Sequence, residues 1–265
     1  MKGRKTAILY ETHLWNTDIE NEFQQISNID YFDSWLLLDS RTPQLDTIRM
    51  GVQHCYVFDV NQLFNLPYPR LAVCPNSLPF GHAHFPVLSF YLTHPEYEDY
   101  WFIEYDVRYS GNWRNFFAEF SKYPHDLITS HIRSFQEEPD WGWWRTFSHP
   151  DISLPRNLWL RSFNVIYRIS NQALACLHQC LPEGWCGHHE VLVVTALKYH
   201  GLSLLDFGGD GSFALPNLYN STYISSNSPN GTLSDSLHGA TLRWRPVMTS
   251  AGPLPDKLYH PVRDI

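Results

Sequence analysis

Three short apolar segments, each closed by polar residues, lie in the first sixty positions of the chain. They are Thr6–Tyr10, Ser34–Leu38 and His54–Phe58. Runs of four or five apolar residues that close in this way are typical of parallel strands buried on both faces of a sheet. A further apolar run, Tyr100–Ile103, predicts another buried strand.

Segments with helical spacing alternate with these strands. The helices expected are Asp18–Ile29, Val60–Phe64, Phe85–Leu92, Trp113–Phe120, Ser170–Leu181 and His188–Tyr199, the last as a helix or a strand–helix segment. Later strands are expected at Asp126–Ser130 and Leu202–Leu205, and loops at Leu66–Pro79, Gln136–Pro155 and Asp210–Pro255. The alternation predicts an α/β fold with a mostly parallel central sheet flanked by helices and a loop-rich C-terminal region. Without a repeat or an evident linker, residues 1–265 are expected to form a single domain.

Composition narrows the class of protein. Of the 265 residues, 43% are hydrophobic and 17% are charged, which allows a large core and excludes global disorder. The formal charge is −8 and no run of Lys or Arg stands out, which argues against a broad nucleic-acid surface. Ten Trp residues are many for this length. Such rings either stack on sugars and bases or fill the core.

Location is also read from the sequence. No segment approaches the roughly 20 apolar residues that span a bilayer, and the apolar part of the N-terminus is too short for the core of a signal peptide. Five Cys residues are an odd and sparse set for a disulfide framework. We therefore expect a cytoplasmic protein without a transmembrane segment.

Two carboxylates follow the strand Tyr100–Ile103, at Glu104 and Asp106. In an open α/β sheet, ligands bind beyond the carboxyl ends of the strands. Two acids placed there can hold a divalent cation whose remaining positions take phosphates and water. The tripeptide Glu104-Tyr-Asp106 equally fits two solvated acids at the end of a strand.

Three motifs in order along the chain carry a family resemblance. They are Trp101-Phe-Ile-Glu104-Tyr-Asp106, Gly187-His-His-Glu190 and Tyr259-His260-Pro. The chain resembles the nucleotide-diphospho-sugar glycosyltransferases of the GT-A fold, and more narrowly a poorly characterised branch of them, from about Thr6 to Val262. The usual acid motif of that family is Asp-x-Asp. Here Glu replaces the first Asp, which keeps an oxygen ligand and lengthens one arm.

The resemblance implies three roles. Asp106, assisted by Glu104, would hold Mn²⁺ or Mg²⁺ against the diphosphate, and His260 would add a nitrogen ligand from the tail. Glu190 would occupy the position that removes the acceptor proton in inverting members, with His188 the next candidate. The alternatives are a surface His260 in a turn set by the following Pro, and a Glu190 that only favours a helix N-terminus.

Further candidates follow from position. The residues at the ends of the first three strands are candidates for base and ribose contacts, and an Arg beyond the fourth strand can offset phosphate charge: Glu11, Thr12, His13, Asp39, Asp59 and Arg108. Trp141, Trp143 and Trp144 form a candidate acceptor platform, although packing within their own loop explains them equally well. Residues 1–110 are expected to form the nucleotide-sugar-binding half and residues 111–265 the acceptor-binding half with the tail.

A zinc site near the second motif is disfavoured. Cys176, Cys180, Cys186, His188 and His189 lie close together in sequence, but their spacing matches no structural zinc pattern. Cys176 and Cys180 are four residues apart, which fits the buried face of a helix.

The sequence thus predicts transfer of a sugar from a nucleotide-diphosphate donor to the hydroxyl of a glycan or glycolipid acceptor. Two rivals remain open. A metal-dependent nucleotidyltransferase or phosphohydrolase would use the same acid pair, and a non-catalytic glycan-binding module would need neither metal nor nucleotide.

Overall fold

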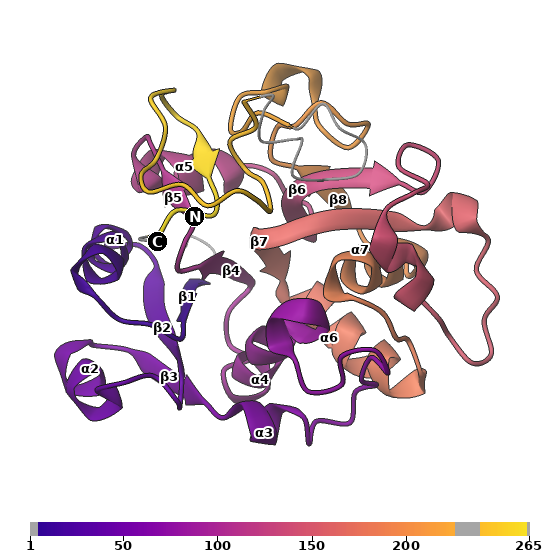
Figure 1. The fold of residues 1–265 in the computed structure, drawn as a ribbon, viewed down its shortest axis with the longest axis horizontal. Helices are drawn as coiled ribbons and strands as arrows, with labels where there is room; N and C mark the ends of the chain where they lie inside the picture. The colour runs from indigo at the N-terminus through magenta and orange to yellow at the C-terminus, as the bar shows by residue number, and fades with distance from the viewer. Residues whose placement is uncertain (1–4, 226–238, 264–265) are drawn as a thin grey trace.

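A seven-stranded sheet forms the centre of the computed structural model, which describes residues 5–225 and 239–263 (Figure 1). Its strands run in the order β3-β2-β1-β4-β7-β6-β8. They are β1 (Thr6–Thr12), β2 (Asp33–Asp39), β3 (Cys55–Phe58), β4 (Asp99–Glu104), β6 (Leu127–Ser134), β7 (Leu160–Ser170) and β8 (Leu204–Asp206). Only β7 runs antiparallel to its neighbours. The predicted α/β class with a mostly parallel sheet is confirmed.

Helices cover both faces of this sheet. They are α1 (Thr17–Ser27), α2 (Leu45–Gly51), α3 (Val60–Leu63), α4 (Phe85–Thr93), α5 (Trp113–Phe120), α6 (Asn171–Cys180) and α7 (His189–Tyr199). Alternate residues of β1 belong to two separate cores, with Ala7 and Leu9 packed among α3, α4, α6 and α7. Ile8 and Tyr10 pack among α1, α2 and α5 on the opposite face. Because both faces are covered, the strand is apolar at successive positions and not only at alternate ones.

Helix starts follow simple capping chemistry. The side chains of Asn16, Asn112 and Ser170 each accept a hydrogen bond from a backbone N–H in the first turn of α1, α5 and α6. Such a cap satisfies one of the N–H groups that have no partner inside the helix. None of the helices in the described part of the chain has the length and apolarity needed to cross a membrane.

The strands and helices expected from periodicity are present with small shifts at their ends, and the segment expected at His188–Tyr199 is a helix from His189 onward. The expected loops contain short helical turns at Leu78–His82, Gly142–Thr146 and Pro216–Leu218. Residues 226–238 of the last expected loop lie outside the described residues. Two further short strands, β5 (Arg108–Tyr109) and β9 (Leu258–Tyr259), pair as a separate antiparallel ribbon.

Strand β7 and helix α2 were not expected from the sequence. Strand β7 is central and almost wholly buried, yet it carries Arg161, Asn164 and Arg168. These polar residues break the apolar run that identifies a buried strand. They are tolerated because each has partners inside the protein, as buried polar groups require.

Arg168 shows how one such charge is accommodated. Its guanidinium donates to the backbone carbonyls of Phe120, Tyr123 and His125. Its Nε lies 3.7 Å from the buried carboxylate of Asp99 on the neighbouring strand β4. The side chain is only 2% exposed, so it joins the end of α5 to two strands of the sheet.

Replacing Arg168 by Met should therefore lower the free energy of unfolding by about 3–5 kcal/mol, because it removes the positive charge beside a buried carboxylate and the donor of three hydrogen bonds to backbone carbonyls. Urea denaturation followed by circular dichroism measures this loss. Arg114→Met is the matched control, since the Arg114–Asp30 pair lies at the surface and should matter little. Equal losses in both variants would contradict the structural role of Arg168.

Candidate functional site

The carboxyl ends of the parallel strands β1, β2 and β4 meet at one edge of the sheet. Glu104 is the last residue of β4, and the register places Glu11 of β1 directly opposite it. Asp106 follows in the turn after β4 and is buried. This is the edge where open α/β sheets bind their ligands.

His260 joins the two acids from the far end of the chain. Its Nε2 lies 3.3 Å from Asp106 Oδ1 and 3.6 Å from Glu104 Oε2. The ligand atoms of the three side chains all lie within 4.8 Å of one another. The three residues predicted as metal ligands therefore form one group, which we call the acid–His group.

The tail that carries His260 is fixed by backbone pairing and is not a loose flap. Strand β9 pairs with β5, and the Val262 N–H donates to the carbonyl of Asp106 at 2.8 Å. The buried His260 ring contacts the carbonyl of Arg243 through Nδ1 at 2.7 Å. Because a carbonyl only accepts, Nδ1 carries a proton, and Nε2 faces the carboxylates, where it can bind a metal ion once its own proton is lost. The alternative of a surface His260 is wrong.

Electrostatics of the acid–His group favour bound positive charge. Burial disfavours the charged form of His260, but Asp106 and Glu104 outweigh it and raise its pKa to about 10. Burial likewise opposes ionisation of Asp106, yet His260 brings the pKa of that carboxyl below its usual value. Two carboxylates and one imidazole are a donor set that suits a divalent cation, so the residues present fit such an ion.

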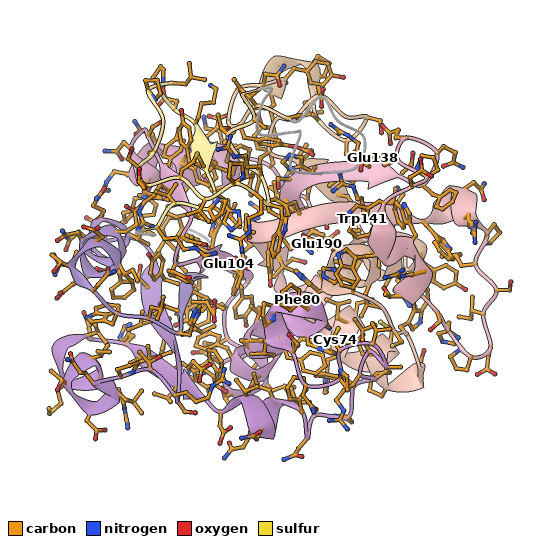
Figure 2. All side chains as sticks on the ribbon, viewed as in Figure 1. Cys74, Phe80, Glu104, Glu138, Trp141 and Glu190 are labelled. Carbon is orange, nitrogen blue, oxygen red and sulfur yellow. The ribbon has the colours of Figure 1, made fainter. Side chains whose placement is uncertain are left out.

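A pocket of about 410 Å³ opens beside the acid–His group and is lined by Glu104. Figure 2 shows Phe80, Glu104, Glu138, Trp141 and Glu190 gathered around the middle of the molecule, and all five line this pocket. Its wall is formed by residues from both halves of the chain. Glu104 of the acid pair and the residues of the second motif therefore line one pocket.

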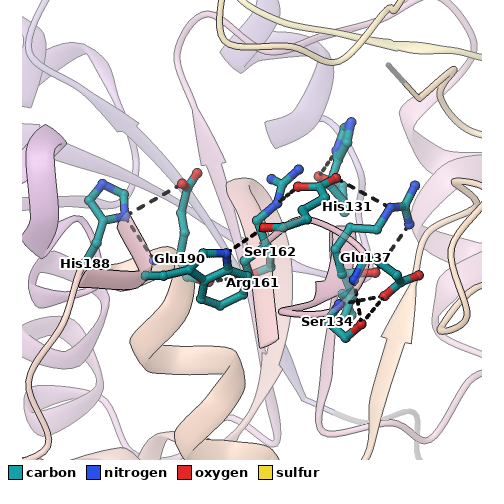
Figure 3. A network of polar contacts seen from close by, with 12 residues as sticks. His131, Ser134, Glu137, Arg161, Ser162, His188 and Glu190 are labelled. Carbon is teal, nitrogen blue, oxygen red and sulfur yellow. Dashed lines mark hydrogen bonds and ion pairs between the residues drawn. The ribbon is translucent and has the colours of Figure 1, made fainter. Parts of the chain in front are cut away.

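Glu190 lies in the first turn of α7 and lines the pocket with a side chain that is 12% exposed. His188 precedes it, caps the helix by accepting from the Glu190 N–H, and has Nδ1 3.7 Å from Glu190 Oε2 (Figure 3). Burial raises the pKa of Glu190 to about 8, although Arg161 attracts the ionised form. Burial holds the pKa of His188 far below its usual value, so that ring is neutral.

The three predicted platform tryptophans have different surroundings. Trp143 lines the pocket and stacks on His188 with ring centroids 4.4 Å apart. Trp141 also lines the pocket and lies under the guanidinium of Arg161. Trp144 is not among the lining residues, and its indole N–H donates to the Glu138 carbonyl at 2.7 Å. Packing therefore accounts for Trp144, whereas two of the three rings face the pocket.

None of the six predicted donor-contact residues lines the pocket. Asp39 is buried and holds Arg41 through two oxygens, and Asp59 caps α3 by accepting from the Asn61 N–H. Arg108 lies 3.6 Å from Glu22 and donates to nearby carbonyls. These three side chains already have partners in the protein.

The residues at the carboxyl end of β1 lie closer to Glu104 and Asp106 than the other predicted donor contacts do. Burial and the charges of Glu104 and Asp106 raise the pKa of Glu11 well above its usual value. His13 is exposed and packs edge-on against Tyr105, between the two acids in sequence, at 5.0 Å between ring centroids. The Thr12 hydroxyl turns back to the Leu14 backbone. All three residues therefore lie at the sheet edge, and none of them lines the pocket.

Four arginines and a glutamate in the pocket wall are not among the site residues predicted from the sequence. Arg133 and Arg161 flank the carboxylate of Glu138, and Arg133 also pairs with Asp210. Arg243 and Arg245 come from Arg-Trp-Arg, a basic–aromatic–basic triplet whose Trp244 is 48% exposed and lies 6.2 Å from the Phe80 ring. The triplet could have been recognised in the sequence as a candidate binding segment. Arg133 on β6 and Arg161 on β7 could not, because nothing in their spacing indicates a pocket.

Comparison with known proteins gives a partial family match. The family described as a protein of unknown function (DUF3405) matches residues 52–127, a span that includes β4 and both acids. No curated protein sequence matches the chain.

Two solved structures are similar at a distance. A putative glucose-1-phosphate thymidylyltransferase from Bacillus anthracis aligns over 77% of this chain and 87% of its own, at 11% identity and a TM-score of 0.42. The 4-diphosphocytidyl-2C-methyl-D-erythritol synthase from Anaerococcus prevotii covers the same shares at 6% identity and a TM-score of 0.45. Similarity at this level says nothing about activity, which has to be argued from the site.

The environment of Glu190 predicts a pH dependence of stability. The folded chain keeps the Glu190 proton up to about pH 8, whereas the unfolded chain loses it near the ordinary value of 4.5. Stability contributed by the protonated carboxyl is complete below that ordinary value and is lost as pH rises through about 8. Glu190→Gln cannot ionise, so its free energy of unfolding relative to the wild type should increase across this window. Urea titrations in metal-free buffer at several pH values measure it, and a constant difference would contradict the prediction.

Proposed function

We propose that this protein is a metal-dependent glycosyltransferase that moves a sugar from a nucleotide-diphosphate donor to a hydroxyl of a glycan or glycolipid acceptor. One observation carries the proposal. The acid–His group, through Glu104, and the carboxyl of Glu190 line the same pocket, so a cation site and a candidate base face one enclosed space. A cation can offset the charge of the leaving diphosphate and a base can remove the hydroxyl proton, so having both in one pocket suits this transfer.

The donor side is assigned to residues 1–110 with the tail. Glu104, Asp106 and His260 would hold Mn²⁺ or Mg²⁺, with Mn²⁺ favoured by the imidazole. The ion, when bound, supplies positive charge for the diphosphate as it leaves. Glu11, Thr12 and His13 lie at the same sheet edge and are the nearest groups for the nucleotide.

Asp39, Asp59 and Arg108 would serve the donor less directly. Their side chains are engaged with Arg41, the start of α3 and Glu22. They stabilise the loops on which donor contacts would lie.

Glu190 is assigned the role of general base toward the acceptor hydroxyl. A carboxyl acts as a base only when it is ionised, and with a pKa of about 8 the ionised form of Glu190 predominates above about pH 8. Its place in the first turn of α7 anchors it to a helix. The neutral His188 ring stacks on Trp143 and contacts the Glu190 carboxyl, so it holds that carboxyl in position. His188 is also the second candidate for the base.

The acceptor side is assigned to residues 111–265. Trp141 and Trp143 offer apolar ring faces inside the pocket, and ring faces of this kind pack on the C–H faces of sugars. The half-exposed rings of Phe80 and Trp244 extend the same lining outward. Trp144 supports this surface from behind.

A thermal-shift screen of nucleotide sugars with and without Mn²⁺ tests the proposal. A donor that binds the folded state raises the melting temperature according to RT ln(1 + [L]/Kd), and here only when Mn²⁺ is present. Analysis of products then separates the rivals, because a phosphohydrolase or nucleotidyltransferase cleaves or exchanges the diphosphate without an acceptor. A shift with glycans alone and none with nucleotides would favour a non-catalytic binding module.

Asp106→Asn should abolish transfer and the Mn²⁺-dependent part of donor binding, because it removes an anionic ligand from the acid–His group. Calorimetric titration of the donor with and without Mn²⁺ measures the effect, and circular dichroism checks the fold. Asp151→Asn, an exposed carboxylate outside the pocket lining, is the matched control and should bind like the wild type. Near-normal transfer by Asp106→Asn with the metal chelated would rule out the metal role.

Glu190→Gln should lower turnover by about 10²–10⁴-fold while donor affinity stays within a few-fold, because the base acts on the acceptor alone. Steady-state kinetics and donor calorimetry separate the two quantities. Glu20→Gln, an exposed acid on α1, should leave both unchanged. If donor affinity collapses together with turnover, Glu190 serves the cation or the phosphates, and His188 becomes the base to test.

A further inference from the structure

A second group of metal-ligand side chains lies at the opposite end of α7 from Glu190. It consists of Cys176 and Cys180 on α6 and His200, the residue that caps the C-terminus of α7. Their two sulfur atoms and one ring nitrogen lie within 4.8 Å of one another. We propose that this group, the Cys₂His group, binds Zn²⁺ or another thiophilic divalent cation.

The fold explains why these three residues meet. Cys176 and Cys180 are four residues apart on α6, so both lie on one side of that helix. Helix α6 packs against α7 in the same hydrophobic core, which brings its last turn to the residue after α7. Trp185, fully buried, packs against the His200 ring at 5.7 Å between centroids and limits where that ring can lie.

This is a different imidazole from the two considered from the sequence. His188 and His189 lie at the start of α7, an eleven-residue helix that is about 16 Å long. They face the pocket, so they cannot reach the cysteines. The relevant His is distant from the Cys pair in sequence, and only the packing of α6 on α7 reveals it.

The chemistry of the group selects a particular kind of ion. Two thiolates and one imidazole are soft and borderline ligands that bind Zn²⁺ far better than Mg²⁺ or Mn²⁺. The charges of two thiolates cancel those of the cation, so no net charge is left in a half-buried place.

Access and the remaining coordination position also suit an ion. Cys180 is buried and Cys176 is half-buried, whereas His200 is exposed and its ring has no hydrogen bond to another described residue. An ion can enter from the His200 side and keep a water there as a fourth ligand. Glu183, exposed in the turn after α6, lies near enough to act electrostatically on both sulfurs.

A bound ion would link the end of α6 to the end of α7. Helix α7 carries Glu190 in its first turn, so the link would stiffen the support of the pocket without touching it. The site itself does not depend on the function proposed above, because its ligands include none of the pocket residues.

Cobalt(II) titration of the metal-stripped full chain under a phosphine reductant tests the proposal. Thiolate ligands give intense sulfur-to-cobalt charge-transfer absorption, which oxygen and nitrogen ligands of the acid–His group do not. We expect these bands to saturate at one equivalent and to disappear on addition of Zn²⁺. Asp106→Asn should leave them unchanged, which separates this site from the proposed catalytic one.

His200→Gln is the decisive variant, because an exposed side chain can be replaced without risk to the fold. It should weaken Co²⁺ binding at least about tenfold, since even outer-shell partners of metal ligands are worth that much. Cys176→Ser should remove most of the charge-transfer intensity. Cys55→Ser, a half-buried Cys in the core on the other face of the sheet, should bind like the wild type.

Two results would overturn the proposal. The first is the absence of thiolate bands at stoichiometric Co²⁺ in the reduced wild type. The second is equal affinity in the wild type and in His200→Gln, which would leave the two cysteines as a metal-binding pair without the imidazole.

Discussion

Burial of the sheet on both faces is the constraint from which the rest of this molecule follows. Strands β1, β2 and β4 have no polar face, so charged side chains are confined to their ends or must be neutralised inside. The acid pair of β4 lies where the strand leaves the core. The same constraint places Glu11 and Asp39 at that edge, and it gives the sheet one end at which polar chemistry can be done.

Strand β7 meets this constraint in a different way. It runs antiparallel through the middle of the sheet and carries its charges within the core, where Glu138 and Asp99 balance Arg161 and Arg168. Buried ion pairs of this kind add little net stability compared with apolar packing, but they are costly to break. They also fix geometry. Arg161 lines the pocket and attracts the ionised form of Glu190, so the structural balance of β7 reaches into the site.

The sequence allowed the parallel half of the fold to be predicted because its strands are uninterrupted apolar runs. The burial of residues such as Ile8 and Phe102 can be predicted from the apolar residues next to them in the sequence. Strand β7 could not be predicted in this way, since Arg168 is compatible with burial only through carbonyls and a carboxylate that are distant in sequence. The acid–His group was accessible through motif order, whereas the pairing of His200 with the cysteines depends on how two helices pack.

The hydrogen bond from Val262 to Asp106 has a consequence for the order of assembly. More than half of the chain separates these two residues, and that chain supplies β6, β7 and α7. During synthesis the sheet edge with its two acids can therefore form long before His260 leaves the ribosome. Until His260 docks, the nascent chain has a pair of neighbouring carboxylates without their imidazole, so the cation site is completed only after β6, β7 and α7 have been synthesised.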